Sequence, residues 1–365
     1  MKKKKVIMAP GVDVIVSIVE ALPTVGLACV LARTSRDAIL FTTVFWMPLF
    51  ALPWIKQRKP LAAAGVNAVG LLIVVWQIQD QQVLRPFATA ISLFAIIKAY
   101  DFAIHFPDMD AARHYAGTVF FLNITQRKHV PSIADCFPME TMLDLVVTGL
   151  VIVTSVIGIY LCQECQSPEY PMVGLQLPSN WLDWSIMHIR CGLIGIAFGY
   201  TLNLLKFVYQ LWYAPFRIVH TEDVMNHPLL ATSLMEFWSY RWNRLIHGFL
   251  KRNIYLPLCK QPYCNEATAT MMTFAFAGVF HVLLLEAGTK GSVAADLGCM
   301  AFFLCQAPLM FLETKLFTKR KQSASTSTPT TPGLLLANRL FVFVSLLATA
   351  PLLIEPCLRS PDVKA

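Results

Sequence analysis

Charged residues are scarce in this 365-residue chain, because Asp, Glu, Lys and Arg together make up only 14% of it. A soluble domain usually carries about 25%. Apolar residues make up 56%, and they come in blocks of roughly 18 to 22, the length that a helix needs to cross about 30 Å of hydrocarbon. Alternating strands of about ten residues, which a membrane barrel would need, are absent. The sequence therefore predicts an all-α polytopic integral membrane protein.

Signatures of soluble enzymes and of metal sites are also missing. The chain has no G-x-S-x-G elbow, no P-loop and no H-E-x-x-H motif. Its ten cysteines are scattered, and the one close pair, Cys162 and Cys165, has no second pair or histidines at zinc-ligand spacing. His220 and His227 are not at helical i, i+4 spacing and do not indicate a metal site. We expect no bound metal and no bound cofactor.

The apolar blocks and the basic residues between them predict the topology. The net charge of +8 does not indicate a nucleic-acid partner, because the Lys and Arg residues lie in short loops, as the positive-inside pattern requires. That pattern favours a cytosolic N-terminus, and it makes the sequon at Asn123 cytosolic and unglycosylated. We expect nine spans, with eight or ten also compatible: residues 12–31, 38–55, 61–78, 87–104, 142–162, 189–210, 268–286, 294–313 and 334–354.

One stretch, Ser233–Leu258, is too rich in aromatic and basic residues for a span. As a continuous helix it is amphipathic, and the topology places it on the cytosolic side of the membrane. Such a helix suits the membrane–water interface, so an interfacial anchor is one interpretation and a functional segment is the other. The residues expected on its shared face are Phe237, Trp238, Arg241, Trp242 and Leu245.

His281 is the sharpest candidate for chemistry. It is the only ionisable residue of the span Thr268–Glu286 before the terminal glutamate. An ionisable side chain inside a bilayer is costly and indicates function, and imidazole is the usual general base near neutral pH. A histidine that bonds a neighbouring helix is the alternative. Gly278, one turn earlier, leaves room for a substrate or for a closely packed helix.

Other ionisable groups in or beside spans are expected to be structural. Lys98 and Asp101 are three residues apart on one helix face and can pair. Asp144 is near a span end and can reach water, and Glu20 is expected to make a structural hydrogen bond.

The motif within this stretch resembles that of a known family. Ser233-Leu234, Phe237-Trp238 and Arg241-Trp242-Asn243 follow the order and spacing of the signature of the wax synthase-like branch of the membrane-bound O-acyltransferases. In that family the signature precedes the span that carries the catalytic histidine, which His281 matches. The resemblance implies a single membrane-embedded acyltransferase domain over residues 1–365, with the motif region and the histidine span at residues 228–286.

The resemblance also implies roles for individual residues. His281 would take the proton of a hydroxyl as its oxygen attacks a thioester carbonyl, and Asn243, or as a second candidate Asn253, would position the thioester or bind the oxyanion. Trp238 and Trp242 either contact substrate or pack as interfacial anchors. The basic residues either bind the phosphates of coenzyme A or reflect positive-inside charge: Arg241, Arg244, Lys251 and Arg252.

Size and motif most resemble fungal members, which are O-acetyltransferases of terpenoid or meroterpenoid alcohols in secondary metabolism. On this hypothesis the co-substrate is acetyl-CoA, the acceptor is a lipophilic alcohol in the bilayer, and the protein resides in the endoplasmic reticulum. A wax ester synthase that uses long-chain fatty acyl-CoA is the alternative within the same class. A membrane transporter is the alternative of another class, but it predicts internal repeats and paired broken helices, and we find no convincing repeat.

Overall fold

The computed structural model describes residues 39–40, 43, 50–77, 84–105, 127–165, 180–220, 224–289, 293–322 and 332–358. The chain divides into two compact units. The first comprises Met1–Pro131 and Trp212–Glu222, and the second comprises Ser132–Leu211 and Asp223–Ala365. The predicted span 12–31 and half of the span 38–55, together with Glu20 and the sequon at Asn123, lie outside the described residues.

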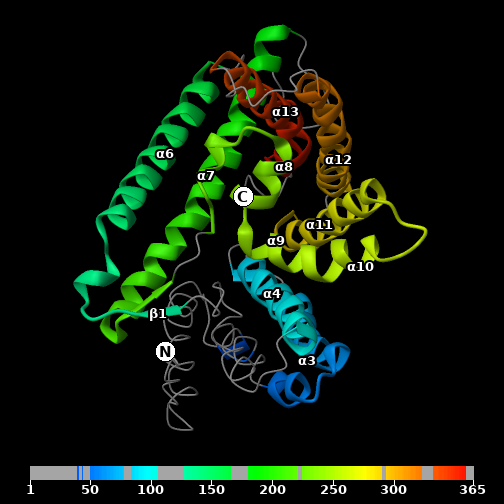
Figure 1. The fold of residues 1–365 in the computed structure, drawn as a ribbon. Helices are drawn as coiled ribbons and strands as arrows, with labels where there is room; N and C mark the ends of the chain where they lie inside the picture. Colours follow the sequence, from blue (N-terminus) through cyan, green and yellow to red (C-terminus); the bar gives the residue numbers. More distant parts are fainter. Residues whose placement is uncertain are drawn as a thin grey trace. The chain divides into compact units, whose positions relative to one another are not determined.

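The first unit contains a helical hairpin and a small strand pair. Its elements are α3 (Pro60–Gln77), α4 (Leu84–His105), β1 (Arg127–His129), η3 (Ala214–Phe216) and β2 (Ile218–His220). The helices α3 and α4 lie side by side (Figure 1). The two strands pair antiparallel. Lys98 and Asp101 are both buried on α4, so burial agrees with the expected structural role, and their mutual pairing stays a prediction.

The second unit contains the long apolar helices and the motif segment. Its long helices are α6 (Met139–Glu164), α7 (Trp181–Tyr213, of which the last two residues fall in the first unit), α11 (Glu266–Thr289), α12 (Val293–Gln322) and α13 (Pro332–Leu358). Its short elements are η2 (Ala134–Cys136), η4 (Pro228–Leu230), α8 (Leu234–Glu236), η5 (Phe237–Arg241), α9 (Arg244–Leu250), η6 (Lys251–Tyr255) and α10 (Leu256–Cys259). In sequence order, α11, α12 and α13 each pack against the next (Figure 1).

Side-chain caps set where two long helices begin. The backbone N–H of Asp183 donates to Oδ1 of Asn180 at 2.8 Å, and the Asn180 amide donates back to Oδ2 of Asp183 at 2.8 Å. At the start of α11, the N–H of Thr268 donates to Oδ1 of Asn265 at 2.8 Å. These bonds satisfy backbone donors that a helix leaves open in its first turn.

Polar bonds tie the long helices together. Arg190 on α7 and Glu355 on α13 form a buried ion pair, with Nη2 and Oε2 at 2.7 Å. Between α7 and α6, the Asn203 amide donates to Oγ1 of Thr148 at 3.0 Å. Lys206 Nζ lies 3.6 Å from Oδ2 of Asp144, so this carboxylate has a cationic partner within the helix pair. Such bonds fix helix register where apolar contacts alone discriminate weakly.

Six helices of the described residues are long and apolar enough to cross a membrane. They are Ala88–His105, Met139–Glu164, Trp181–Leu204, Glu266–Leu285, Val293–Leu316 and Gly333–Leu358. Each overlaps a predicted span, and Pro60–Val74 is a shorter apolar helix where the span 61–78 is expected. Helix α6 exposes Leu150, Val153 and Ile157 by more than half of each side chain, which suits contact with lipid rather than water. The helical polytopic architecture is confirmed, with one short strand pair beside the helices, and the count of nine spans is not.

Candidate active site

The motif segment is not the continuous amphipathic helix expected from its periodicity. It consists of α8, the π-turn η5, a break at Trp242 and Asn243, and then α9, the π-turn η6 and α10. Asn243 has the left-handed backbone angles φ 40° and ψ 61°, a conformation that asparagine tolerates better than most residues. The interpretation as one helix is wrong at this point. The break turns the two halves relative to each other and bends the segment.

The break frees the side chain of Asn243. Its carbonyl accepts the N–H groups of Ile246 and His247 at 3.2 Å each, so the backbone begins α9. Its side chain makes no capping bond and instead lines a cavity. The segment around Val224 stabilises the backbone at this break, because the N–H of Arg244 donates to the carbonyl of Val224 at 3.0 Å.

The first half of the motif is anchored on α12 and α13 through buried polar groups. The indole N–H of Trp238 donates to Oε1 of Gln306 at 3.2 Å, and the Gln306 amide donates to Oγ1 of Thr349 at 3.2 Å. The N–H of Leu234 donates to both carboxylate oxygens of Glu313, at 3.0 and 2.9 Å. Three helical elements are thereby joined at the point where the motif enters the core.

Hydrogen bonds to Glu236 and to two backbone carbonyls hold the side chain of Arg241. Its Nε donates to Oε1 of Glu236 at 2.7 Å, and its Nη1 donates to the carbonyls of Asn226 and His227 at 3.1 and 3.2 Å. Burial opposes ionisation of Glu236, but hydrogen bonds from Thr232 and the charge of Arg241 outweigh it and lower the pKa of this carboxyl. Glu236 is therefore ionised at neutral pH, and its pair with Arg241 braces η5.

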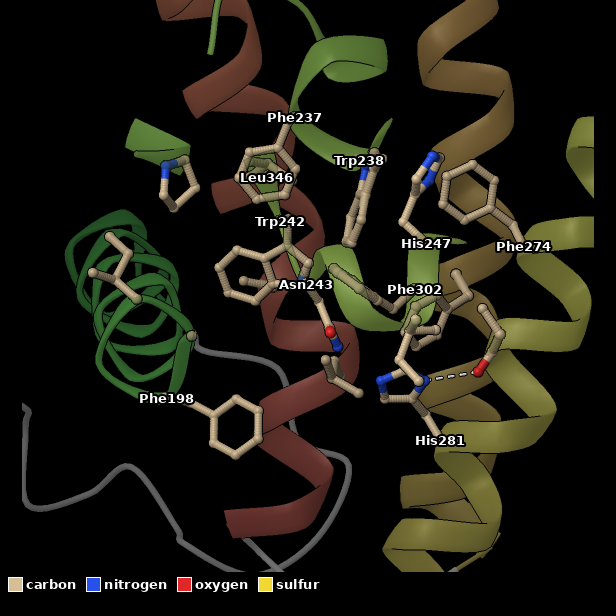
Figure 2. Close-up of a pocket in the computed structure, with 18 of the residues that line it drawn as sticks. Phe198, Phe237, Trp238, Trp242, Asn243, His247, Phe274, His281, Phe302 and Leu346 are labelled. Atoms are coloured by element: carbon tan, nitrogen blue, oxygen red, sulfur yellow. Dashed lines mark hydrogen bonds between the residues drawn. The ribbon is translucent and has the colours of Figure 1, made fainter. Parts of the chain in front are cut away.

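His281 presents one ring nitrogen to the cavity. Nδ1 lies 2.7 Å from the carbonyl oxygen of Ala277, one turn earlier on α11. A carbonyl only accepts hydrogen bonds, so Nδ1 carries the proton and the neutral ring has its lone pair on Nε2. The ring also packs on Phe303 at a centroid distance of 4.4 Å. Figure 2 shows the second nitrogen facing the cavity, with the Asn243 amide directed toward the ring from the other side.

Close helix packing supports this position. A Cβ at Gly278 would lie 2.9 Å from the sulfur of Met300 and 3.3 Å from Cβ of Phe303, both on α12. Gly278 is expected to leave room for a substrate or for a closely packed helix, and the closely packed helix is confirmed.

The cavity has a volume of about 680 Å³ and a mainly apolar wall built from α7, the motif segment, α11, α12 and α13. That volume lies in the range of small-molecule sites. Figure 2 shows Phe198 on one side and His247 with Phe274 on another, while His281 and Asn243 face the space between them. The arrangement suits an apolar molecule whose one polar group meets the histidine.

The structure brings together only part of the predicted site. His281, Asn243, Trp238 and Trp242 line the cavity, whereas Arg241, Arg244, Arg252 and Asn253 are absent from its described lining. The Asn253 amide donates to the carbonyl of Phe249 at 3.1 Å. The guanidinium of Arg252 folds back over Gly248, whose Cβ position would be 3.2 Å from Nη1. Asn243, rather than Asn253, therefore reaches the cavity.

Among the polar residues of the wall, His247 and Tyr255 were not predicted as site residues, whereas Lys251 was expected as a possible phosphate ligand. All three follow Asn243 at steps of four, and this regular spacing is the signal that could have found His247 and Tyr255. Burial, and then the charges of Lys251, Arg244 and Arg252, lower the pKa of His247. No group of three or more His, Cys, Asp and Glu side chains that could hold a metal occurs among the described residues.

Comparison with known proteins places this region in a family context. Residues 221–305 match the membrane bound O-acyl transferase family, and this range contains both the motif and His281. Three Arabidopsis thaliana proteins are similar in part. Probable long-chain-alcohol O-fatty-acyltransferase 2 is 31% identical over 150 residues, 39% of this chain and 40% of its own. Probable long-chain-alcohol O-fatty-acyltransferase 6 is 29% identical over 153 residues, 40% of this chain and 41% of its own.

The third relative, acyl-CoA–sterol O-acyltransferase 1, is 34% identical over 88 residues, 23% of this chain and 25% of its own. The chain thus matches less than half the length of each of these relatives. The similarity to the membrane bound O-acyl transferase family and to these acyltransferases is therefore confined to part of the chain, the part that contains the motif and His281. The resemblance to fungal terpenoid acetyltransferases stays a prediction.

Proposed function

We propose that the protein is an O-acyltransferase that moves an acyl group from acyl-CoA to the hydroxyl of a lipophilic alcohol. The observation that carries this proposal is the setting of His281. Its Nδ1 is tied to Ala277 at 2.7 Å, which leaves Nε2 as the basic nitrogen in an apolar cavity. The partial matches to acyltransferases support the same class.

The reaction needs one base and one anion-binding donor. Nε2 of His281 takes the proton of the acceptor hydroxyl while the hydroxyl oxygen attacks the thioester carbonyl carbon. The carbonyl oxygen becomes an oxyanion in the tetrahedral intermediate. The carbon–sulfur bond then breaks, and the coenzyme A thiolate leaves with the proton from Nε2. The products are an ester and free coenzyme A, and the histidine is neutral again.

Asn243 fits the role of the anion-binding donor. Its side-chain amide is directed toward His281 (Figure 2), and the left-handed backbone at this residue points it away from the α9 cap. A donor in an apolar site stabilises an oxyanion more strongly than it would in water. We expect Asn243→Ala to lower kcat by about a hundredfold.

The proposal also includes two candidates for the identity of the acyl donor and the acceptor alcohol. Our first candidate remains acetyl-CoA and a terpenoid or meroterpenoid alcohol in secondary metabolism, as the fungal resemblance implies. The second is a long-chain fatty acyl-CoA and a long-chain alcohol, which the names of two relatives favour. The apolar wall of the cavity suits either lipophilic acceptor.

One assay tests the proposal and separates the two candidates. Microsomes from an expressing host receive labelled acetyl-CoA or labelled palmitoyl-CoA with a panel of terpenoid, sterol and long-chain alcohols. Label in an ester that disappears in His281→Ala supports the proposal, and the donor used identifies the branch. Turnover of about the wild-type rate in His281→Ala contradicts the base role, and no label from either donor rejects acyl transfer and favours the transporter.

His188 offers a matched control for His281. Its Nδ1 also lies 2.7 Å from the carbonyl four residues earlier, that of Trp184, but His188 is absent from the described cavity wall. His188→Ala removes the same kind of intrahelical bond without touching the site. We expect it to keep wild-type turnover.

We place the N-terminus in the cytosol and the protein in the endoplasmic reticulum. The distribution of Lys and Arg between the apolar blocks supports the orientation. The sequon at Asn123 provides the test, because it stays unmodified in microsomes if its loop is cytosolic. A shift in mass that a glycosidase reverses, and that Asn123→Gln abolishes, would overturn this topology.

A further inference from the structure

One wall of the cavity carries a polar stripe that runs away from the reactive centre. Asn243, His247, Lys251 and Tyr255 all line the cavity, and they follow one another at intervals of four residues from the position before α9 to the end of η6. At this spacing His247 and Lys251 share a helix face, and Asn243 reaches the same cavity from the position before the helix. Asn243 and Lys251 are eight positions apart, which corresponds to about 12 Å at the rise of a helix.

The lining contains one formal positive charge among the described residues, that of Lys251. Lys251 is exposed and also lines the cavity, so the stripe begins at a solvated cation. Two other basic residues of the motif are directed elsewhere: Arg241 is engaged by Glu236 and two carbonyls, and Arg252 lies against Gly248.

Nearby positive charges act on His247. The charges of Lys251, Arg244 and Arg252 add to burial in lowering the pKa of this histidine. The neutral imidazole can donate one hydrogen bond and accept another, which suits amide groups better than phosphates. A ligand with an anionic end, an amide-bearing arm and a reactive end matches the order of groups from Lys251 to Asn243.

We propose that Lys251 binds a phosphate of the coenzyme A moiety of the acyl donor. The proposal rests on the proposed acyl-CoA function and assigns the direction in which the donor lies. The phosphates sit at Lys251, the amide-bearing arm follows the stripe past His247, and the thioester arrives between Asn243 and His281. The apolar wall of α7 and α13 is then left to the alcohol and the acyl chain.

The test removes the charge of Lys251 by substitution and, separately, the phosphates of the acyl donor by use of an analogue. Donor KM is measured in full-length protein with the acyl-CoA that the wild type uses and with the corresponding S-acyl-pantetheine, which has the same arm and no phosphate. A charge-assisted hydrogen bond contributes enough that we expect Lys251→Gln to raise the donor KM for acyl-CoA about tenfold. The KM for S-acyl-pantetheine, the KM for the alcohol and kcat should stay at wild-type values, and Lys251→Arg should restore the KM for acyl-CoA.

Lys260 provides the matched control for net charge. It is exposed at the end of α10 and does not line the cavity, so Lys260→Gln should leave the donor KM unchanged. An acyl-CoA KM in Lys251→Gln equal to that of the wild type overturns the assignment. An equal rise for both donors also overturns it, because loss of a phosphate contact cannot weaken a donor without phosphate.

A binding measurement separates this inference from the proposed function. Coenzyme A is titrated into the purified full-length protein in detergent, for wild type and Lys251→Gln. Binding that weakens about tenfold in the variant supports the inference even where no ester is formed, and in that case only the proposed reaction fails. Equal binding by both proteins, with acyl transfer intact in the wild type, rejects Lys251 and leaves the reaction standing.

Discussion

The indole of Trp242 occupies the space that a side chain at Gly199 would fill. A Cβ at Gly199 would lie 2.5 Å from Cη2 and 2.7 Å from Cζ3 of this ring. Trp242 is also stacked on the buried Phe237 at a centroid distance of 5.3 Å, so it has little freedom to move away. The glycine on α7 thus sets the position of the residue that immediately precedes Asn243.

Gly199→Ala is therefore expected to displace Trp242 and, through the backbone, the amide of Asn243. We predict a loss of about tenfold or more in kcat, because a catalytic group displaced by about 1 Å can lose about a hundredfold in rate. The measurement is ester formation per amount of folded protein.

Gly149→Ala is the control, since a Cβ at Gly149 on α6 meets nothing within 4 Å. It should behave as wild type. Full activity in Gly199→Ala would show that the motif tolerates movement of Trp242.

Arg241 is predicted to act by bracing η5 rather than by binding phosphate. Arg241→Gln leaves Glu236 without its partner at 2.6 Å and removes the bonds to the carbonyls of Asn226 and His227. We expect lower kcat with acyl-CoA and with S-acyl-pantetheine alike. A KM rise confined to acyl-CoA would instead place Arg241 at the phosphates.

The partner of Arg241 illustrates what the sequence can and cannot predict. Glu236 and Arg241 are five residues apart, which puts them on different faces of an α-helix but next to each other in the π-turn η5. Nothing in the apolar periodicity signals a π-turn, so the pair could not be found from spacing. The break at Asn243 was missed for the same reason, because the periodic pattern continues across it.

The residues that could be predicted are those whose chemistry is unusual for their surroundings. His281 stands out as an ionisable group in an apolar block, and Trp238, Trp242 and Asn243 stand out through the family motif. Gln306 and Glu313 both lie in α12. Gln306 is uncharged and Glu313 lies at the end of an apolar block, so the sequence does not indicate that they bond to Trp238 and Leu234 of the motif. Lys251 is one of several cations in sequence, and only the fold shows which of them faces the cavity.

The hydrogen bonds of Gln306 are predicted to stabilise the packing of the motif segment against α12 and α13. Its side chain is fully buried and joins Trp238 to Thr349. Gln306→Leu keeps the volume but leaves the indole N–H without its acceptor, which costs about 1 to 3 kcal/mol in unfolding free energy. Unfolding of the detergent-solubilised protein measures this loss.

Gln261→Leu serves as a comparison, because Gln261 is exposed beyond α10. We expect it to leave the unfolding midpoint unchanged. A Gln306→Leu protein as stable as wild type would mean that the Trp238 N–H finds another partner.

His247 is predicted to make the protein less stable in acid. Burial, followed by the charges of Lys251, Arg244 and Arg252, lowers the pKa of this histidine below its usual value near 6.5. The unfolded chain therefore binds the proton more readily than the folded chain as the pH falls through that value, and folding stability declines until the lower, folded-state pKa is passed. Above about pH 7 both states are neutral at this position and the contribution vanishes.

The effect is measured as the change in unfolding temperature between about pH 7.5 and about pH 5, in wild type and in His247→Gln. The variant cannot take up this proton, so its midpoint should fall less than that of the wild type over the same interval. Lys251→Gln should give an intermediate slope, because it removes one of the three charges that depress the pKa. Parallel curves for wild type and His247→Gln would show that the acid sensitivity comes from other groups and that His247 keeps its ordinary affinity for protons.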